Sequence, residues 1–167
     1  MKVYISGKIG EEVISDETRE KFAAAEKMLQ DKGYRVFNPT DQVWVYALQE
    51  NHRNTVRTIG KDIVMPFYDY CLLKDLQKLA QCDAIYMLTD WRRSPGARTE
   101  HAFASAVGKR FFFEDRFQAC EYLCKEMWDL VKKGTPPTEY LEKDITMAEI
   151  AYGKKHIDRV WQPIKRE

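Results

Sequence analysis

The sequence has little of what a metal site or a disulfide-stabilised fold requires. Its 167 residues include four cysteines and three histidines, and no two cysteines form a CxxC pair. The histidines, His52, His101 and His156, lack the spacing of metal ligands. Cys120 and Cys124 lie one turn apart on an expected helix, where thiols usually pack as small apolar groups. A disulfide or metal role is the less favoured alternative, so we expect no metal site.

Long apolar runs and an excess of charge of one sign are also missing. No run approaches the ~20 residues of a membrane span, and residues 1–7 have the pattern of a strand rather than of a signal peptide. The formal net charge of +1 gives no electrostatic footprint for nucleic acid or an anionic membrane. We therefore expect a cytoplasmic protein that binds neither a nucleic acid polymer nor a membrane.

What remains is the pattern of an α/β domain. A hydrophobic content of 44% and a charged content of 32% are ordinary for a globular chain. Hydrophobic periodicity predicts strands at 3–6, 34–37, 84–88 and 110–113, and helices at 18–32, 67–81 and 95–108. Their alternation predicts an open parallel sheet with helices on both faces.

Two segments fall outside this alternation. Residues 40–66 form an insertion in which Trp44, Tyr46 and Leu48 precede a polar stretch, and we expect it to be partly helical. A connection this long is usually functional or disordered. Residues 115–167 are predicted to form a helical C-terminal extension, packed on the domain that residues 1–114 make. Within it, helices are expected at 117–132 and 140–154.

The beginning of the helix at 95–108 has the features of a ligand site. Ligands of open parallel sheets bind at the carboxyl ends of the strands, where this helix begins. Ser94 is a good N-cap, and Pro95 suits the first helical position. The free backbone N–H groups near Gly96 and Ala97 then form a ready anion site.

Glu100, one turn further along, is the best candidate for chemistry. Its same-face neighbours Gly96 and Ala97 are small, so its carboxylate would look toward the ligand edge of the sheet. The helix dipole would favour the ionised form by ~0.3–1 kcal/mol, and an ionised, partly desolvated carboxylate suits a nucleophile. The alternative is that Glu100 lies at the edge of the apolar stripe and pairs with an arginine such as Arg98.

Other polar residues are open to two interpretations. Asp75 lies at the boundary of the apolar stripe of helix 67–81, as a second carboxylate or as an ordinary surface aspartate. Asp83 is expected to be a turn or cap residue. Asp90 and Trp91 follow the strand at 84–88, at the ligand edge. Trp91 would either stack on a base, a contact worth roughly 1–3 kcal/mol elsewhere, or cover a helix end.

Several short motifs, taken in order, resemble a known superfamily. They are Tyr4-Ile5-Ser6-Gly7, then Asp75-Leu76 eight residues before Asp83, then Ser94-x-Gly96-x-x-x-Glu100 followed by Gly108-Lys109. This set is similar to the nucleoside 2-deoxyribosyltransferase-like superfamily, and within it to the DUF4406 branch. The likeness covers residues 1–39 and 67–114. It implies a flavodoxin-like fold of about four to five strands and a site for a nucleoside or nucleotide.

The resemblance also implies roles for three residues. Glu100 would attack the anomeric carbon of deoxyribose, with water or a second base resolving the glycosyl-enzyme, as in a retaining glycosidase. Tyr4 would orient Glu100, and Asp75 would contact the sugar or handle the proton of the leaving base. Neither a metal nor an organic cofactor is implied. A homo-oligomer is implied, because members usually build the site across a subunit contact.

Ser94 and Gly96 match the branch that hydrolyses 2'-deoxynucleoside 5'-monophosphates, where they would hold the 5'-phosphate. Transferases acting on free nucleosides usually carry an aspartate at the position of Ser94. The first loop departs from the hydrolase pattern of a small hydroxyl and an arginine, because Lys8 and Gly10 stand there. Lys8 would supply the charge as a point cation. The further substrate-binding candidates are Ser6, Gly7, Ile9, Asp90, Trp91 and Arg98.

Two other functions remain open. The chain would be a nucleotide-binding module that senses a ligand without turning it over, with Glu100 bonded to a sugar hydroxyl. Otherwise the site is vestigial, and residues 115–167 bind a protein partner.

Overall fold

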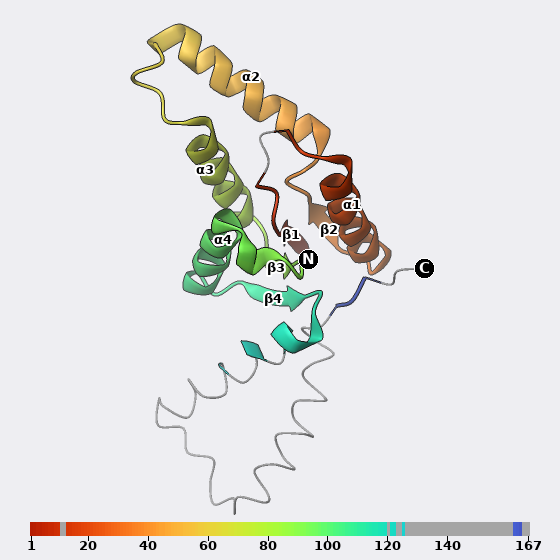
Figure 1. The fold of residues 1–167 in the computed structure, drawn as a ribbon. Helices are drawn as coiled ribbons and strands as arrows, with labels where there is room; N and C mark the ends of the chain where they lie inside the picture. The colour runs from red at the N-terminus through yellow and green to blue at the C-terminus, as the bar shows by residue number, and fades with distance from the viewer. Residues whose placement is uncertain (11–12, 120, 123–124, 126–161, 165–167) are drawn as a thin grey trace, which may run out of the picture.

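The computed structural model describes residues 1–10, 13–119, 121, 122, 125 and 162–164 (Figure 1). In this part the chain forms a parallel sheet with the strand order β2-β1-β3-β4. The strands are β1 (Lys2–Ser6), β2 (Arg35–Phe37), β3 (Ala84–Met87) and β4 (Arg110–Phe113). The helices are α1 (Asp16–Asp31), α2 (Gln42–Ile59), α3 (Phe67–Ala80), the 3-10 helix η1 (Trp91–Arg93) and α4 (Pro95–Ala106).

The expected alternation of strands and helices is confirmed, with element ends within two residues of those expected. The strand order is that of an open flavodoxin-like sheet, in which the chain reverses direction of winding next to β1. Figure 1 shows α1 on one side of the sheet and α3 and α4 on the other. The predicted fold class therefore holds.

The side chains of β1 divide between two hydrophobic cores, because successive strand residues point to opposite faces. Val3 and Ile5 pack with Phe22 and Leu29 of α1. Tyr4 belongs to the core beneath α3 and α4. Every residue of β3 is buried, as a central parallel strand covered on both faces requires.

The insertion 40–66 contains α2, so the expectation of partial helicity is confirmed. Asp41 caps this helix by accepting a hydrogen bond from the Trp44 backbone N–H (3.0 Å). Leu48 is its one buried residue, although the helix has 18 residues. In Figure 1, α2 reaches beyond the body of the domain and joins α3 through an extended connection. Its hold on the domain is therefore confined to a few side chains.

The beginning and end of the C-terminal segment contact the sheet. Residues 116–119, 121, 122 and 125 are helical, and the remaining residues of the expected helices 117–132 and 140–154 lie outside the described residues. Near the chain end, the backbone N–H of Gln162 donates to the carbonyl of Phe113 (2.7 Å). Tyr86 donates its hydroxyl to the carbonyl of Gln162 (2.6 Å). Among the described helices, none is long and apolar enough to cross a membrane.

Candidate functional site

Glu100 accepts hydrogen bonds from two hydroxyls of β1. Tyr4 donates to Oε1 at 2.6 Å and Ser6 donates to Oε2 at 2.5 Å. Both hydroxyls reach the same carboxyl because residues two apart on a strand share a face. These short distances are typical of O–H groups bonded to a charged oxygen. Pairing of Glu100 with Arg98, the alternative drawn from the sequence, is wrong.

Burial and these hydrogen bonds shift the pKa of Glu100 in opposite directions. Only 7% of the residue is exposed, and this desolvation raises the pKa of its carboxyl to about 8. The bonds from Ser6 and Tyr4 lower the pKa, while the charge of Asp75 raises it. Desolvation therefore acts against the ionised form of Glu100, which the helix dipole and the two hydroxyls favour.

Asp75 is the second carboxyl of this cluster, not an ordinary surface aspartate. Burial raises its pKa to about 7, against a hydrogen bond from Trp44 that lowers it. Its charge reaches the other two members, because it raises the pKa values of both Tyr4 and Glu100. The pKa of Tyr4 lies well above its usual value, first of all because of burial. Tyr4 is therefore a neutral donor throughout the physiological range.

The two carboxyls titrate together near neutral pH. Like charges in one buried cluster cannot both form without mutual cost, so the first charge hinders the second. Between about pH 7 and pH 8 the pair holds about one proton, from the pKa values of Asp75 and Glu100. One protonated and one ionised carboxyl within the same cluster is an arrangement that suits general acid–base chemistry.

The beginning of α4 is built as the sequence predicts. Ser94 is the N-cap, and its hydroxyl oxygen accepts the N–H of Ala97 (3.2 Å), with Pro95 in the first turn. A Cβ at Gly96 would come within 3.2 Å of the Tyr68 hydroxyl oxygen, so α3 approaches the helix closely here. Arg98 is exposed and donates to the carbonyl of Arg92 (3.4 Å).

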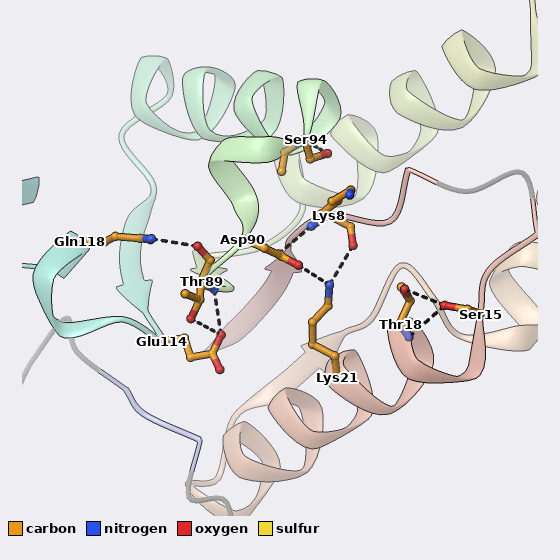
Figure 2. Close-up of polar contacts among 10 residues, drawn as sticks. Lys8, Ser15, Thr18, Lys21, Thr89, Asp90, Ser94, Glu114 and Gln118 are labelled. Atoms are coloured by element: carbon orange, nitrogen blue, oxygen red, sulfur yellow. Dashed lines mark hydrogen bonds and ion pairs between the residues drawn. The ribbon is translucent and has the colours of Figure 1, made fainter.

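The loop after β1 is fixed to the loop after β3 through Asp90 (Figure 2). One oxygen of Asp90 accepts the backbone N–H of Lys8 (3.0 Å), and the other accepts Nζ of Lys21 (2.6 Å). Lys21 also donates to the carbonyl of Lys8 (2.9 Å). Asp90 is thus held by internal partners. Sequence reasoning missed Lys21, which lies on α1, although its position on the sheet-facing side of a helix was a signal.

In the loop after β1, Gly7 and Ile9 pack against the protein, whereas the ammonium of Lys8 does not. The ammonium of Lys8 forms no hydrogen bond or ion pair with any residue that the structure describes. A Cβ at Gly7 would lie 2.6 Å from Cδ1 of Leu88, so only glycine allows this approach to β3. Ile9 packs against the core beneath α1. The loop therefore packs closely against the protein, whereas the Lys8 ammonium has no partner among the described residues.

Trp91 is 9% exposed and packs inside the protein. Its ring stacks on His101 of α4 (centroids 4.5 Å apart, planes at 9°), and its indole N–H donates to Gln118 (2.8 Å). Figure 2 shows Gln118 bonded in turn to the Thr89 carbonyl, beside the Thr89–Glu114 contacts. Stacking on a base would require the ring to be uncovered first.

The opposite edge of the sheet has a different character. A hollow of ≈ 440 Å³ there is lined by Met1, Cys82, Asp83, Val107, Gly108, Lys109 and Arg110. Asp83 accepts the backbone N–H of Lys2 (2.6 Å), so it joins the beginning of β1 to the residue before β3 instead of forming the expected turn or cap. Among the described residues that line this hollow, none form a buried acid–base pair. Nowhere in the described ranges do three potential metal ligands gather.

Comparison with known proteins leaves the chemistry open. No curated protein matches the chain. Residues 1–113, which contain the whole sheet and every candidate site residue, match the family described as "Domain of unknown function (DUF4406)". The chain therefore belongs to the DUF4406 family.

Proposed function

We propose that this protein cleaves the N-glycosidic bond of a 2'-deoxynucleoside 5'-monophosphate, with Glu100 as the nucleophile. The observation that carries the proposal is the buried Glu100 carboxyl, bonded to both Tyr4 and Ser6 and facing the charge of Asp75. The resemblance to nucleoside 2-deoxyribosyltransferase-like proteins implies the roles of nucleophile for Glu100, orienting residue for Tyr4 and assisting carboxyl for Asp75. Water completes the reaction as a hydrolysis, and a second base would complete it as a transfer.

The first step forms a bond between a Glu100 oxygen and the anomeric carbon while the bond from that carbon to the base nitrogen breaks. The electron pair of the broken bond stays on the base, and the proton of Asp75 neutralises it. In the second step, water attacks the anomeric carbon, the Glu100–carbon bond breaks, and Asp75 takes the proton of the water. This is the two-step sequence of a retaining glycosidase.

In the free protein the pKa values run against this division of labour, because Asp75, with a pKa of about 7, loses its proton before Glu100, with a pKa of about 8. The proposed mechanism therefore requires the shared proton to lie on Asp75 when substrate is bound. Tyr4 and Ser6 donate to Glu100 and stabilise its ionised form once substrate is in place. A catalytic acid works best with a pKa near the working pH.

A phosphate on the substrate fits the beginning of α4. Ser94 caps a twelve-residue helix, whose first N–H groups favour an anion. Lys8 is the candidate cation of the loop after β1, and its ammonium has no partner among the described residues. Both features support a nucleotide in preference to a free nucleoside.

A homo-oligomer is part of the proposal. The α2–α3 surface, the outward face of α2, α3 and their connection, carries exposed large apolar side chains, among them Val43, Tyr46, Ile63 and Tyr68. These side chains are spread along α2, the connection and the beginning of α3, and large exposed apolar surfaces often mark contacts between proteins. A second copy covering this surface would lie beside Trp44 and Asp75, close to the site.

The second candidate is a nucleotide-binding module without turnover. The raised pKa of Glu100 favours it, because a neutral carboxyl is a poor nucleophile but a good partner for a sugar hydroxyl. Binding of the same monophosphates without base release is the expected result for this candidate.

The deciding experiment measures free-base release by chromatography. The substrates are the common 2'-deoxynucleoside 5'-monophosphates and their unphosphorylated nucleosides. Glu100→Gln serves as the test variant, and Glu20→Gln, which removes an exposed carboxyl from α1, as the matched control. Release by the wild type and by Glu20→Gln, lost in Glu100→Gln, supports the glycosidase. No release by the folded wild type, with calorimetric binding intact, decides for the module.

A further inference from the structure

Trp44 lies outside every motif that suggested a site, yet its side chain touches one of the two carboxyls. It stands in the first turn of α2, where Asp41 fixes its backbone N–H. Its indole Nε1–H donates to Oδ1 of Asp75 at 2.9 Å. Asp75 belongs to α3, so this bond joins the insertion to the site. Sequence reasoning noted Trp44 only as an apolar residue of the insertion.

The indole is held on three sides. Its ring meets Phe37 of β2 edge to face (centroids 5.3 Å apart, planes at 82°), and the ammonium of Lys78 lies 4.7 Å from its centroid. Phe37 in turn stacks on Tyr4 at 5.5 Å. We call Trp44, Phe37 and Tyr4 the aromatic row. Its two ends donate hydrogen bonds to the two carboxyls, Trp44 to Asp75 and Tyr4 to Glu100.

The two oxygens of Asp75 are in different situations. Oδ1 accepts the indole N–H, and no described residue donates to Oδ2. Among the described residues, every buried side-chain oxygen has a hydrogen-bond partner, so Oδ2 meets solvent. The indole therefore occupies one oxygen and leaves the other without a donor among the described residues.

An indole nitrogen only donates, so its bond favours the ionised form of Asp75. Among the described residues it is the one group that lowers the pKa of Asp75, whereas burial raises that pKa. The other groups facing Asp75 are Glu100 of α4, Tyr4 of β1 and Cys71 of α3, each of which has a pKa that the charge of Asp75 raises. The ammonium of Lys78 contacts the indole ring. Among the described residues it makes no ion pair with the Asp75 carboxyl.

We propose that Trp44 is the positioning residue of Asp75: it fixes the carboxyl with one oxygen toward the substrate and makes α2 a part of the site. The role of Asp75 in catalysis rests on the proposed function, whereas the coupling of Trp44 to Asp75 does not. Trp44 and Leu48 are among the few side chains that hold α2 on the domain. Packing of α2 and positioning of Asp75 therefore depend on the same contacts.

The first test needs no substrate. The nitrogen and proton shifts of the Trp44 indole are followed by NMR from pH 5 to pH 9, with the signal assigned by its loss in Trp44→Phe. The signal is expected to titrate with a midpoint near 7, the pKa of Asp75, and not to do so in Asp75→Asn. An indole signal that is flat in the wild type, or that titrates equally in Asp75→Asn, overturns the proposal.

The second test asks whether the bond acts on the chemistry. In Trp44→Phe, which keeps a ring against Phe37 but has no donor, the basic limb of the pH profile of base release, where Asp75 loses its proton, is expected to move up by about one pH unit, as for a tenfold weaker acid. Glu20→Gln, on the exposed face of α1, is expected to leave it unchanged. An unmoved limb in Trp44→Phe refutes the role.

Misfolding of Trp44→Phe and absence of base release in the wild type lead to different conclusions. If Trp44→Phe fails to fold, β-(3-benzothienyl)alanine at position 44 keeps the indole shape and replaces the N–H with sulfur, and the same shift is expected of it. If the wild type releases no base, the proposed function fails. The NMR titration of the indole then still decides the coupling between Trp44 and Asp75.

Discussion

The buried carboxyl of Glu100 is expected to make the protein less stable as the pH rises. In an unfolded chain this carboxyl ionises near pH 4.5, whereas burial raises its pKa in the folded protein to about 8. Between these values the folded protein holds a proton that the unfolded chain has lost. The free energy of unfolding therefore falls through this range and levels off above pH 8, where both states are ionised.

The size of the effect follows from the shift. Each pKa unit corresponds to about 1.4 kcal/mol, so the shift from 4.5 to about 8 sets a limit of about 5 kcal/mol. Only the part between pH 5.5 and pH 8 is convenient to measure, and it amounts to about 3 kcal/mol. This is a large share of the stability of a typical domain, about 5–15 kcal/mol.

Glu100→Gln isolates the contribution, since an amide has the same shape and no charge to lose. Urea denaturation of both proteins at several pH values gives the difference in unfolding free energy. Relative to the wild type, Glu100→Gln is expected to gain about 3 kcal/mol between pH 5.5 and pH 8. Glu20→Gln, on the exposed face of α1, is expected to run parallel to the wild type. A constant difference between Glu100→Gln and the wild type would refute a burial-driven shift.

Three further predictions concern the neighbours of Glu100. Tyr4→Phe removes one donor and should lower base release about 10–100-fold, since a hydrogen bond to a charged group is worth about 1.5–3 kcal/mol, while urea denaturation still finds a folded protein. Ser94→Asp should raise KM for monophosphates at least tenfold and leave nucleosides unaffected, by repulsion at the beginning of α4; equal changes for both substrates would contradict a phosphate site. Lys21→Met breaks the bonds to Asp90 and Lys8, and hydrogen exchange at the Lys8 amide should accelerate, against an unchanged rate in α3.

The sequence was sufficient for the sheet and for the core of the site. Period-2 alternation along β1 puts Tyr4 and Ser6 on one face, and the small residues before Glu100 direct its carboxyl to that face. Local pattern alone could not establish how deeply Glu100 is buried, because α3 covers it from a distant part of the chain. The dipole argument therefore left out the desolvation that raises the pKa of Glu100.

Long-range contacts account for what sequence reasoning missed. Trp44 stood in an insertion with no motif, and the position of Asp75 beside it depends on how α2 and α3 pack. Trp91 had two interpretations because burial of a loop residue depends on its neighbours, here His101 and Gln118. A tryptophan whose N–H must find a partner when buried was the one signal available for Trp44.

The place of β1 in the sheet has a consequence for synthesis on the ribosome. This first strand pairs with β2 on one side and with β3 on the other, so its second edge stays open until residue 87 has left the exit tunnel. An open strand edge is a template for pairing with another chain. The nascent protein is therefore most prone to aggregate while α2 and α3 are being made. Because Tyr4 and Glu100 are 96 positions apart, no nascent fragment shorter than that can assemble the site.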